Sequence, residues 1–286
     1  MLISYLDIDP HELDELDTFQ WYIKTIAQGF RTGKKISRKL GAGMEFSQYR
    51  PYSQGDDLRR LDWKMYARSD RYYIKESEIE TQLEVTFVLD TSRSMAYEES
   101  GRSKFKFAKL LIGILSYLSL QEGDSIGLAA AGYQLSGQDE KAWRRFMFEL
   151  MERKETPDFQ PPAIVNKHRK ELFVVLTDHY EESSDIPHFV EELKTSRNEV
   201  IVLHLMGNRE RTLDFKAGDR FQDLENNQIV AFEAAKKKEY DERVSLWMDN
   251  LQQQYLSQAI DYIRLDFSTP FTSVIRSINN HRKNLL

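Results

Sequence analysis

Residues 84–95, with the sequence E-V-T-F-V-L-D-T-S-R-S-M, constrain the fold of this chain more than any other stretch. A short apolar run ends at Asp90, and Ser92 and Ser94 follow at alternate positions. An apolar run of this length, bounded by polar residues, is typical of a strand that is buried on both faces of a parallel sheet. The polar residues then fall just beyond the carboxyl end of the strand, which is the edge where open α/β sheets bind ligands.

The polar side chains that follow this strand are all hard oxygen donors. Asp90, Ser92 and Ser94 bring one carboxylate and two hydroxyls to a single tight loop. Mg²⁺ and Mn²⁺ prefer oxygen ligands, and they retain water at their open positions. The pattern therefore indicates a Mg²⁺ or Mn²⁺ site, and a serine-rich turn without a metal is the structural alternative.

A second buried strand, at residues 172–176, is followed by the sequence T-D-H. Asp178 lies just beyond this strand end, as Asp90 does beyond the first, and we interpret it as a further carboxylate of the metal site. The alternative role for Asp178 is to cap a turn or a helix. We interpret His179 as a residue that supports the ligands from behind or lies at the surface, and not as a ligand.

Strands alternate with helices through the larger part of the chain. We expect strands at residues 125–133, 172–176, 199–206 and 261–267, helices at 103–120, 141–152, 186–196, 238–260 and 269–282, and a hairpin at 220–224 and 228–232. This alternation predicts a parallel sheet with helices on both faces. The expected fold is α/β, a doubly wound and mostly parallel sheet of Rossmann-like arrangement, with a small N-terminal α+β extension.

The N-terminal extension is expected to have two parts, residues 1–37 and 38–82, ahead of a main domain at residues 83–286. The first part combines a helix with a basic linker, and the second has a helix at residues 58–67 followed by a strand at 71–79. Its dense mixed charges favour an internal network of ion pairs, and the alternative is a docking surface for a protein partner. The candidates for partner contact are Arg50, Asp56, Arg59, Asp62, Trp63 and, from the first loop, Arg93.

A resemblance to a known family lies in the second part. The chain is similar to a bacterial domain-of-unknown-function family, number fifty-eight, in which F-x-x-Y-R-x-Y-x-x-G-D-x-x-R-x-I-D-W-x-x-x-A-R precedes a von Willebrand factor A-like domain. The matching residues are Phe46, Tyr49, Arg50, Tyr52, Gly55, Asp56, Arg59, Asp62, Trp63, Ala67 and Arg68, with Leu61 where Ile is usual. The resemblance extends from about Arg38 to the C-terminus, and Asp-x-Ser-x-Ser opens the family's metal-ion-dependent adhesion site.

The resemblance implies a set of metal ligands and a kind of partner. Ser92, Ser94 and Thr156 are implied as direct ligands, and Asp90 and Asp178 as ligands that act partly through water; Thr156 is matched by its order and loop context. The third loop of such sites commonly reads Thr-Asp-Gly, so the histidine at position 179 departs from the pattern. The implied partner is a MoxR-type AAA+ ATPase, with a role in the maturation of protein complexes or in metal insertion.

Composition excludes several other classes. The net charge of −6 argues against a general nucleic-acid binder, and the absence of cysteine excludes disulfides and thiolate metal sites. The acidic N-terminus does not read as a signal peptide, and no apolar stretch is long enough to span a bilayer, so we expect a cytoplasmic protein. The chain has no P-loop, G-x-S-x-G or H-E-x-x-H motif.

Three functions remain open from the sequence. The preferred hypothesis is a non-enzymatic interaction module in which a partner's carboxylate completes the coordination of the metal. The alternative is a Mg²⁺-dependent hydrolase of phosphoesters or peptides, with Asp90 and Asp178 as metal ligands and Arg93, Arg50 or Arg59 over the metal. A third possibility is a structural subunit with a vestigial metal loop.

Overall fold

Two compact units make up the chain, one comprising Met1–Gly33 and Leu83–Leu286 and the other Lys34–Gln82. The computed structural model describes residues 20, 23–24, 26–27, 46–53, 61–77, 83–99, 101–131, 133–164, 171–180, 185–212, 220–222, 229–231, 237–266 and 275. The larger unit carries the main sheet, and each unit is considered by itself below.

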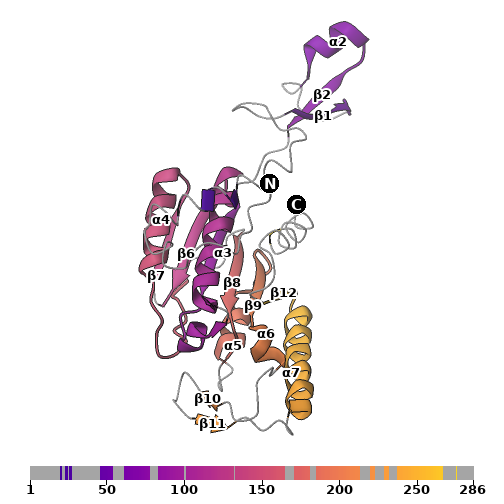
Figure 1. The fold of residues 1–286 in the computed structure, drawn as a ribbon. Coiled ribbons are helices and arrows are strands. Elements are labelled where there is room, and N and C mark those ends of the chain that lie inside the picture. The colour runs from indigo at the N-terminus through magenta and orange to yellow at the C-terminus, as the bar shows by residue number, and fades with distance from the viewer. Residues whose placement is uncertain are drawn as a thin grey trace, which may run out of the picture. The chain divides into compact units, whose positions relative to one another are not determined.

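A six-stranded sheet forms the centre of the larger unit, in the order β12-β9-β8-β3-β6-β7 (Figure 1). Its strands are β3 (Glu84–Leu89), β6 (Ser125–Ala130), β7 (Tyr133–Gly137), β8 (Glu171–Thr177), β9 (Glu199–Leu205) and β12 (Asp261–Leu265). Every neighbouring pair is parallel except β6 and β7, which are antiparallel. This confirms the predicted α/β fold with a mostly parallel sheet.

The edge strand β7 corrects one detail of the sequence analysis. Residues 125–133 were expected to form one strand, but the chain turns after Ala130, and Ala131 adopts a left-handed φ of 41°. The chain then returns along β6, where Leu135 faces Leu128. The run of small apolar residues reads as one continuous strand, and Gly132 is the turn signal within it.

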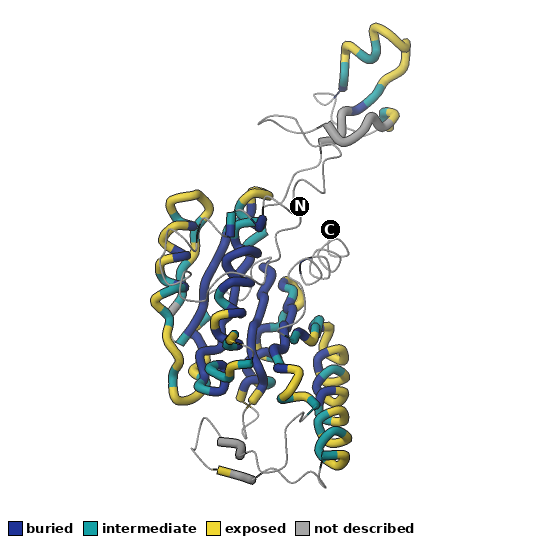
Figure 2. The backbone as a smooth tube through the Cα atoms, viewed as in Figure 1, coloured by how far each residue is buried: buried dark blue, intermediate teal, exposed yellow. Residues whose placement is uncertain are grey.

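Helices cover both faces of the sheet. α3 (Lys104–Gln121) and α4 (Glu140–Glu152) pack on one face, and α5 (Asp185–Leu193) and α7 (Lys237–Ser257) on the other. The strands alternate accordingly, since Phe87 and Leu89 of β3 join the cluster under α3 and α4, whereas Val88 joins the cluster under α5 and α7. Figure 2 shows the strands as the most continuously buried part of this unit.

Residues near the N-terminus contribute to the core of the larger unit. Ile23 and Ile26 are buried in the cluster that contains α3 and α4. At Gly113 of α3 an added Cβ would lie 2.2 Å from Cδ1 of Ile23, so a residue without a side chain permits this close approach. Lys24 donates to Glu140 at 3.0 Å, which fixes the same segment against α4.

The smaller unit contains a hairpin and a short helix. β1 (Phe46–Pro51) pairs antiparallel with β2 (Tyr73–Ser77), and α2 spans Trp63–Ser69. The helix predicted at residues 58–67 begins later than expected, because Leu61 forms a β-bridge with Ile74 and Asp62 is the extended N-cap residue. Residues 58–60 lie outside the described part of the chain.

The remaining elements lie at the ends of the sheet strands or on the surface. They are η3 (Arg93–Ala96), β4 (Glu98–Glu99), β5 (Arg102–Ser103), α6 (Asn208–Thr212), β10 (Arg220–Gln222) and β11 (Ile229–Ala231). β10 and β11 pair antiparallel, which confirms the predicted hairpin. Apart from Ile275, the helix predicted at 269–282 lies outside the described residues. No helix in the described ranges has both the length and the apolar character that crossing a bilayer requires.

Candidate metal centre

The two candidate carboxylates lie where the strand order of the sheet reverses. From β3 the chain continues to β6 on one side, and it later returns to β8 on the other side of β3. Asp90 follows β3, Asp178 follows β8, and the backbone N–H of Asp90 donates to the carbonyl of Leu176 at 2.9 Å. Such switch points are where open α/β sheets bind their ligands. The fold therefore brings together the two loop ends that the sequence singled out.

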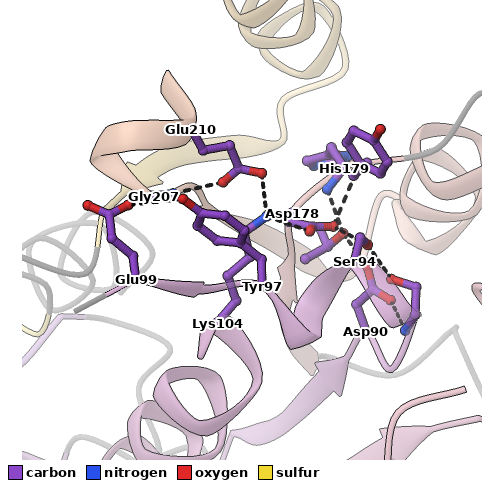
Figure 3. A network of polar contacts seen from close by, with 12 residues as sticks. Asp90, Ser94, Tyr97, Glu99, Lys104, Asp178, His179, Gly207 and Glu210 are labelled. Atoms are coloured by element: carbon purple, nitrogen blue, oxygen red, sulfur yellow. Dashed lines mark hydrogen bonds and ion pairs between the residues drawn. The ribbon is translucent and has the colours of Figure 1, made fainter. Parts of the chain in front are cut away.

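The first loop, residues 90–94, is folded around its own polar groups. The Ser92 N–H donates to Oδ1 of Asp90 at 2.8 Å, and the hydroxyls of Ser92 and Ser94 lie 3.0 Å apart. Ser94 also donates to Oδ1 of Asp178 at 3.1 Å (Figure 3). All four side chains are buried. A continuous chain of hydrogen bonds thus joins the ends of β3 and β8.

The third loop, residues 178–180, supports Asp90 through its neighbour Thr177. The Thr177 hydroxyl donates to Oδ2 of Asp90 at 2.6 Å and accepts the N–H of His179 at 3.0 Å. His179 has a left-handed φ of 54°, a conformation that a glycine adopts without cost. The histidine therefore keeps a backbone shape suited to the glycine of the family pattern.

His179 is buried, so its expected surface alternative is wrong. Its ring lies 5.0 Å from the ring of His204 and 5.6 Å from that of Tyr255. Burial lowers the pKa of His179 to about 4, which leaves the imidazole neutral at pH 7. Among the described residues, neither ring nitrogen of His179 has a hydrogen-bond partner. The side chain packs behind the third loop as an apolar group does.

Thr156 reaches the first loop mainly through its backbone. It forms a parallel β-bridge with Ser92, and its N–H donates to the carbonyl of Thr91 at 2.6 Å. Its hydroxyl bonds to Thr91 and to the carbonyl of Asp158. The structure therefore places Thr156 beside the first loop, as its order in the chain predicted, with the hydroxyl engaged by Thr91 and Asp158.

A buried lysine that the sequence analysis missed lies at the same site. Lys104, the first residue of α3, donates to Oδ2 of Asp178 and to Oε1 of Glu210, each at 2.7 Å. Burial alone lowers the pKa of this ammonium, but the two carboxylates outweigh burial and raise the pKa above its ordinary value. Lys104 is therefore charged at neutral pH.

The carboxylates of Asp90 and Asp178 repel each other. Burial and, next, the nearby charge of Asp178 raise the pKa of Asp90 to about 6. The carboxylates of Asp178 and Glu210 contact the ammonium of Lys104, and the carboxylate of Asp90 lies within the electrostatic influence of Asp178. Counted as ionised groups, these three carboxylates and one ammonium carry a net formal charge of −2.

The chemistry of these donors fits a hard divalent cation. Carboxylate and hydroxyl oxygens suit Mg²⁺ and Mn²⁺, and a net charge of −2 matches the charge of one such ion. In the ranges that the structure describes, no group of three or more His, Cys, Asp or Glu side chains is arranged to hold a metal. A site of this kind needs no such group, because the hydroxyls of Ser92 and Ser94 supply part of the ligand set.

The candidate residues for partner contact lie in different places, and only some of them are in the described part of the chain. Asp62 caps α2, because its carboxylate accepts the N–H groups of Lys64 and Met65 at 2.9 and 3.0 Å. Trp63 is 63% exposed, and its ring lies 6.3 Å from that of Tyr66, which in turn stacks on Tyr72 at 4.5 Å. The side chain of Arg50 and all of Asp56 and Arg59 lie outside the described part, whereas Arg93 belongs to η3 of the larger unit.

Three curated proteins are similar in sequence to part of the chain. An uncharacterized protein of Mycobacterium tuberculosis, Rv1480, and one of Mycobacterium bovis, Mb1516, are each 27% identical to it over 123 residues. The match covers 43% of this chain and 39% of each relative, so the chain spans less than half the length of the curated relatives it matches.

Two of the solved structures to which the chain is similar come from Bacteroides species. A conserved hypothetical protein BatB from Bacteroides thetaiotaomicron is 19% identical, with a TM-score of 0.41, over 70% of this chain and 99% of that one. An aerotolerance-related membrane protein from Bacteroides fragilis is 20% identical, with a TM-score of 0.39, over 69% and 97% of the two chains.

The family model described as protein of unknown function DUF58 matches residues 48–246. This range includes the first loop, the third loop, Lys104 and Glu210. It confirms the resemblance that the signature in the smaller unit indicated. The chain belongs to the DUF58 family of proteins of unknown function.

Proposed function

We propose that this protein is a non-enzymatic protein-interaction module whose binding depends on a divalent cation, Mg²⁺ or Mn²⁺. The observation that carries the proposal is the chain of hydrogen bonds between buried groups that runs from Asp90 through Ser92 and Ser94 to Asp178, at the switch point of the sheet. With a metal bound, Ser92, Ser94 and Thr156 supply hydroxyl oxygens and the two aspartates supply carboxylate oxygens. A cation bound there offers an open position to a carboxylate of another protein.

Binding is favoured over catalysis by the state of Asp178. Ser94 donates to one oxygen of this carboxylate, and Lys104 donates to the other. Because both oxygens of Asp178 already accept hydrogen bonds, this carboxylate is suited to holding the loop and a cation rather than to acting as the general base for Ser94. We therefore assign these residues to coordination.

We further propose a MoxR-type AAA+ ATPase as the partner, with a role in the maturation of protein complexes or in metal insertion. Membership of the DUF58 family supports this assignment, since the resemblance to that family implies such a partner. The metal site offers the attachment point, because a surface carboxylate of the ATPase can complete the coordination. The proposed location of this complex is the cytoplasm.

The test is a binding measurement between the purified protein and the MoxR-type ATPase of the same organism, in Mg²⁺ and in EDTA. We expect binding in Mg²⁺ only, loss of binding in Ser94→Ala, and no change in the control Ser136→Ala, which alters an exposed serine of the edge strand β7. Equal binding in EDTA would place the contact away from the metal site. Metal-dependent hydrolysis of a phosphoester or peptide by the protein alone would favour the hydrolase.

A further inference from the structure

Lys104 stands out because it is a lysine that is almost completely buried. The residue is 1% exposed and extends from the first turn of α3 toward the loop that follows β8 (Figure 3). Its ammonium lies 5.1 Å from the centre of the Tyr97 ring, in addition to its two carboxylate partners. An ammonium is buried only where other charges compensate its lost hydration. The surroundings of Lys104 are therefore built to hold a positive charge.

The two oxygens of Asp178 have separate partners. Oδ1 accepts the hydroxyl of Ser94 at 3.1 Å and the N–H of Tyr180 at 3.2 Å, and Oδ2 accepts Lys104 at 2.7 Å. Oδ1 is thus hydrogen-bonded to the candidate ligand Ser94, and Oδ2 is paired with the ammonium of Lys104. Because Oδ1 keeps two donors of its own, Asp178 does not depend on Lys104 alone for its position.

Glu210 holds the ammonium from the opposite side. Its Oε1 accepts Lys104, and its Oε2 accepts the N–H of Gly207 at 2.9 Å. Tyr240 of α7 donates to the carbonyl of Glu210 at 3.0 Å, so the short helix α6 is fixed at both its side chain and its backbone. The positive charge of Lys104 is thus shared between a candidate metal ligand and a residue of a separate element.

We propose that Lys104 is an internal counter-cation of the metal site, and that Lys104 and Glu210 together set how tightly the site binds a divalent cation. This proposal rests on the proposed function. Without the metal, the ammonium offsets the repulsion between the buried carboxylates of Asp90 and Asp178. With the metal, the ammonium and the cation share Asp178 and repel each other, so Lys104 weakens metal binding and Glu210 strengthens it.

The test is the affinity of the purified full-length chain for Mg²⁺, measured by titration calorimetry. Two variants are compared with the wild type, and they are expected to change this affinity in opposite directions. Lys104→Met keeps most of the apolar stem and removes the charge, so we expect binding at least about fivefold tighter than in the wild type. Glu210→Gln leaves the ammonium with one carboxylate, so we expect binding at least about fivefold weaker. The control is Lys109→Met, which alters a half-buried lysine of α3 that donates to the carbonyls of Met151 and Arg153.

The outcomes separate the two proposals. A wild type that binds no Mg²⁺ refutes the metal site itself. A wild type that binds Mg²⁺, with both variants equal to it or shifted in the same direction, overturns the role of Lys104. If circular dichroism shows that Lys104→Met does not fold, Glu210→Gln decides, since its side chain is 20% exposed and its loss is less costly. The double variant is expected to bind within about threefold of the wild type, because removal of one positive and one negative charge leaves the net charge of the cluster unchanged.

Discussion

Lys104 and Asp178, 74 residues apart in the sequence, form an ion pair with 2.7 Å between Nζ and Oδ2 and with both side chains excluded from solvent. The pair ties the start of α3 to the loop after β8, beside the reversal point of the sheet. It also places a permanent positive charge next to the candidate ligands. The stability of this region and its affinity for a cation are therefore linked.

Removal of the charge on Asp178 should destabilise the metal-free protein. Asp178→Asn keeps the size of the side chain and an acceptor for Ser94, but it leaves Lys104 facing only Glu210. Loss of one partner of a buried ion pair typically costs 3–5 kcal/mol, and we expect about 3 kcal/mol in the free energy of unfolding from urea titration. Glu210→Gln should cost less. A cost below about 1 kcal/mol for Asp178→Asn would show that the pair is not structurally important.

The caps of α2 predict a local effect in the smaller unit. Asp62→Ala removes the side chain that accepts the N–H groups of Lys64 and Met65, which should cost about 1 kcal/mol of local stability. Asp70, at the other end, has a left-handed φ of 52°, so Asp70→Gly should be neutral or stabilising. Hydrogen exchange of the amides of α2 measures both. Faster exchange in Asp70→Gly than in Asp62→Ala is the contrary result.

Lys109 predicts a dependence of stability on pH. Burial is the main cause that lowers the pKa of its ammonium to about 8. Between pH 8 and the unfolded-state pKa of about 10.4 the unfolded chain binds more protons than the folded one, so Lys109 makes the protein more stable as pH rises through this window. The free energy of unfolding of the wild type, minus that of Lys109→Met, should therefore increase from pH 8 to 10.5. A constant or falling difference would refute the lowered pKa.

The N-terminal segment should contribute to the stability of the larger unit. Ile23 is completely buried against Gly113 of α3, so Ile23→Ala should leave a cavity and lower the free energy of unfolding by about 3 kcal/mol. Ile229→Ala is the matched control, because Ile229 is 61% exposed and its loss should cost less than about 0.5 kcal/mol. Thermal and urea unfolding of both variants measure the difference. Equal stability of the two would mean that residue 23 does not pack on α3 in solution.

The sequence predicted the sheet and the positions of its polar loops because buried parallel strands are apolar throughout and end abruptly. Asp90 and Asp178 each follow such a run, and the topology then places them side by side. Ser92 and Ser94 could be predicted from the sequence in the same way, since two serines at alternate positions after a strand end must share one loop. These residues are predictable because their signal is local.

The residues that the sequence did not reveal depend on tertiary contacts. A lysine at the first turn of a helix is usually solvated, and only the approach of Asp178 after β8 and of Glu210 in α6 makes the burial of Lys104 possible. Leu61 has a spacing that suits a helix, but pairing with Ile74 places it in a β-bridge. Ala131 turns the chain through a positive φ, which an alanine rarely adopts and which its side chain does not predict. For Lys104 and Leu61, a partner from another part of the chain determines the local structure.

The central claim is that the oxygens of Asp90, Ser92, Ser94, Thr156 and Asp178 bind a divalent cation. Titration of the protein with Mn²⁺, followed by electron paramagnetic resonance, measures this most directly, because free and bound Mn²⁺ give different signals. We predict one bound Mn²⁺ for each chain, displacement by excess Mg²⁺, and loss of the bound ion in Ser94→Ala but not in Ser136→Ala. Absence of bound Mn²⁺ in the wild type, or equal binding in Ser94→Ala, would contradict the account.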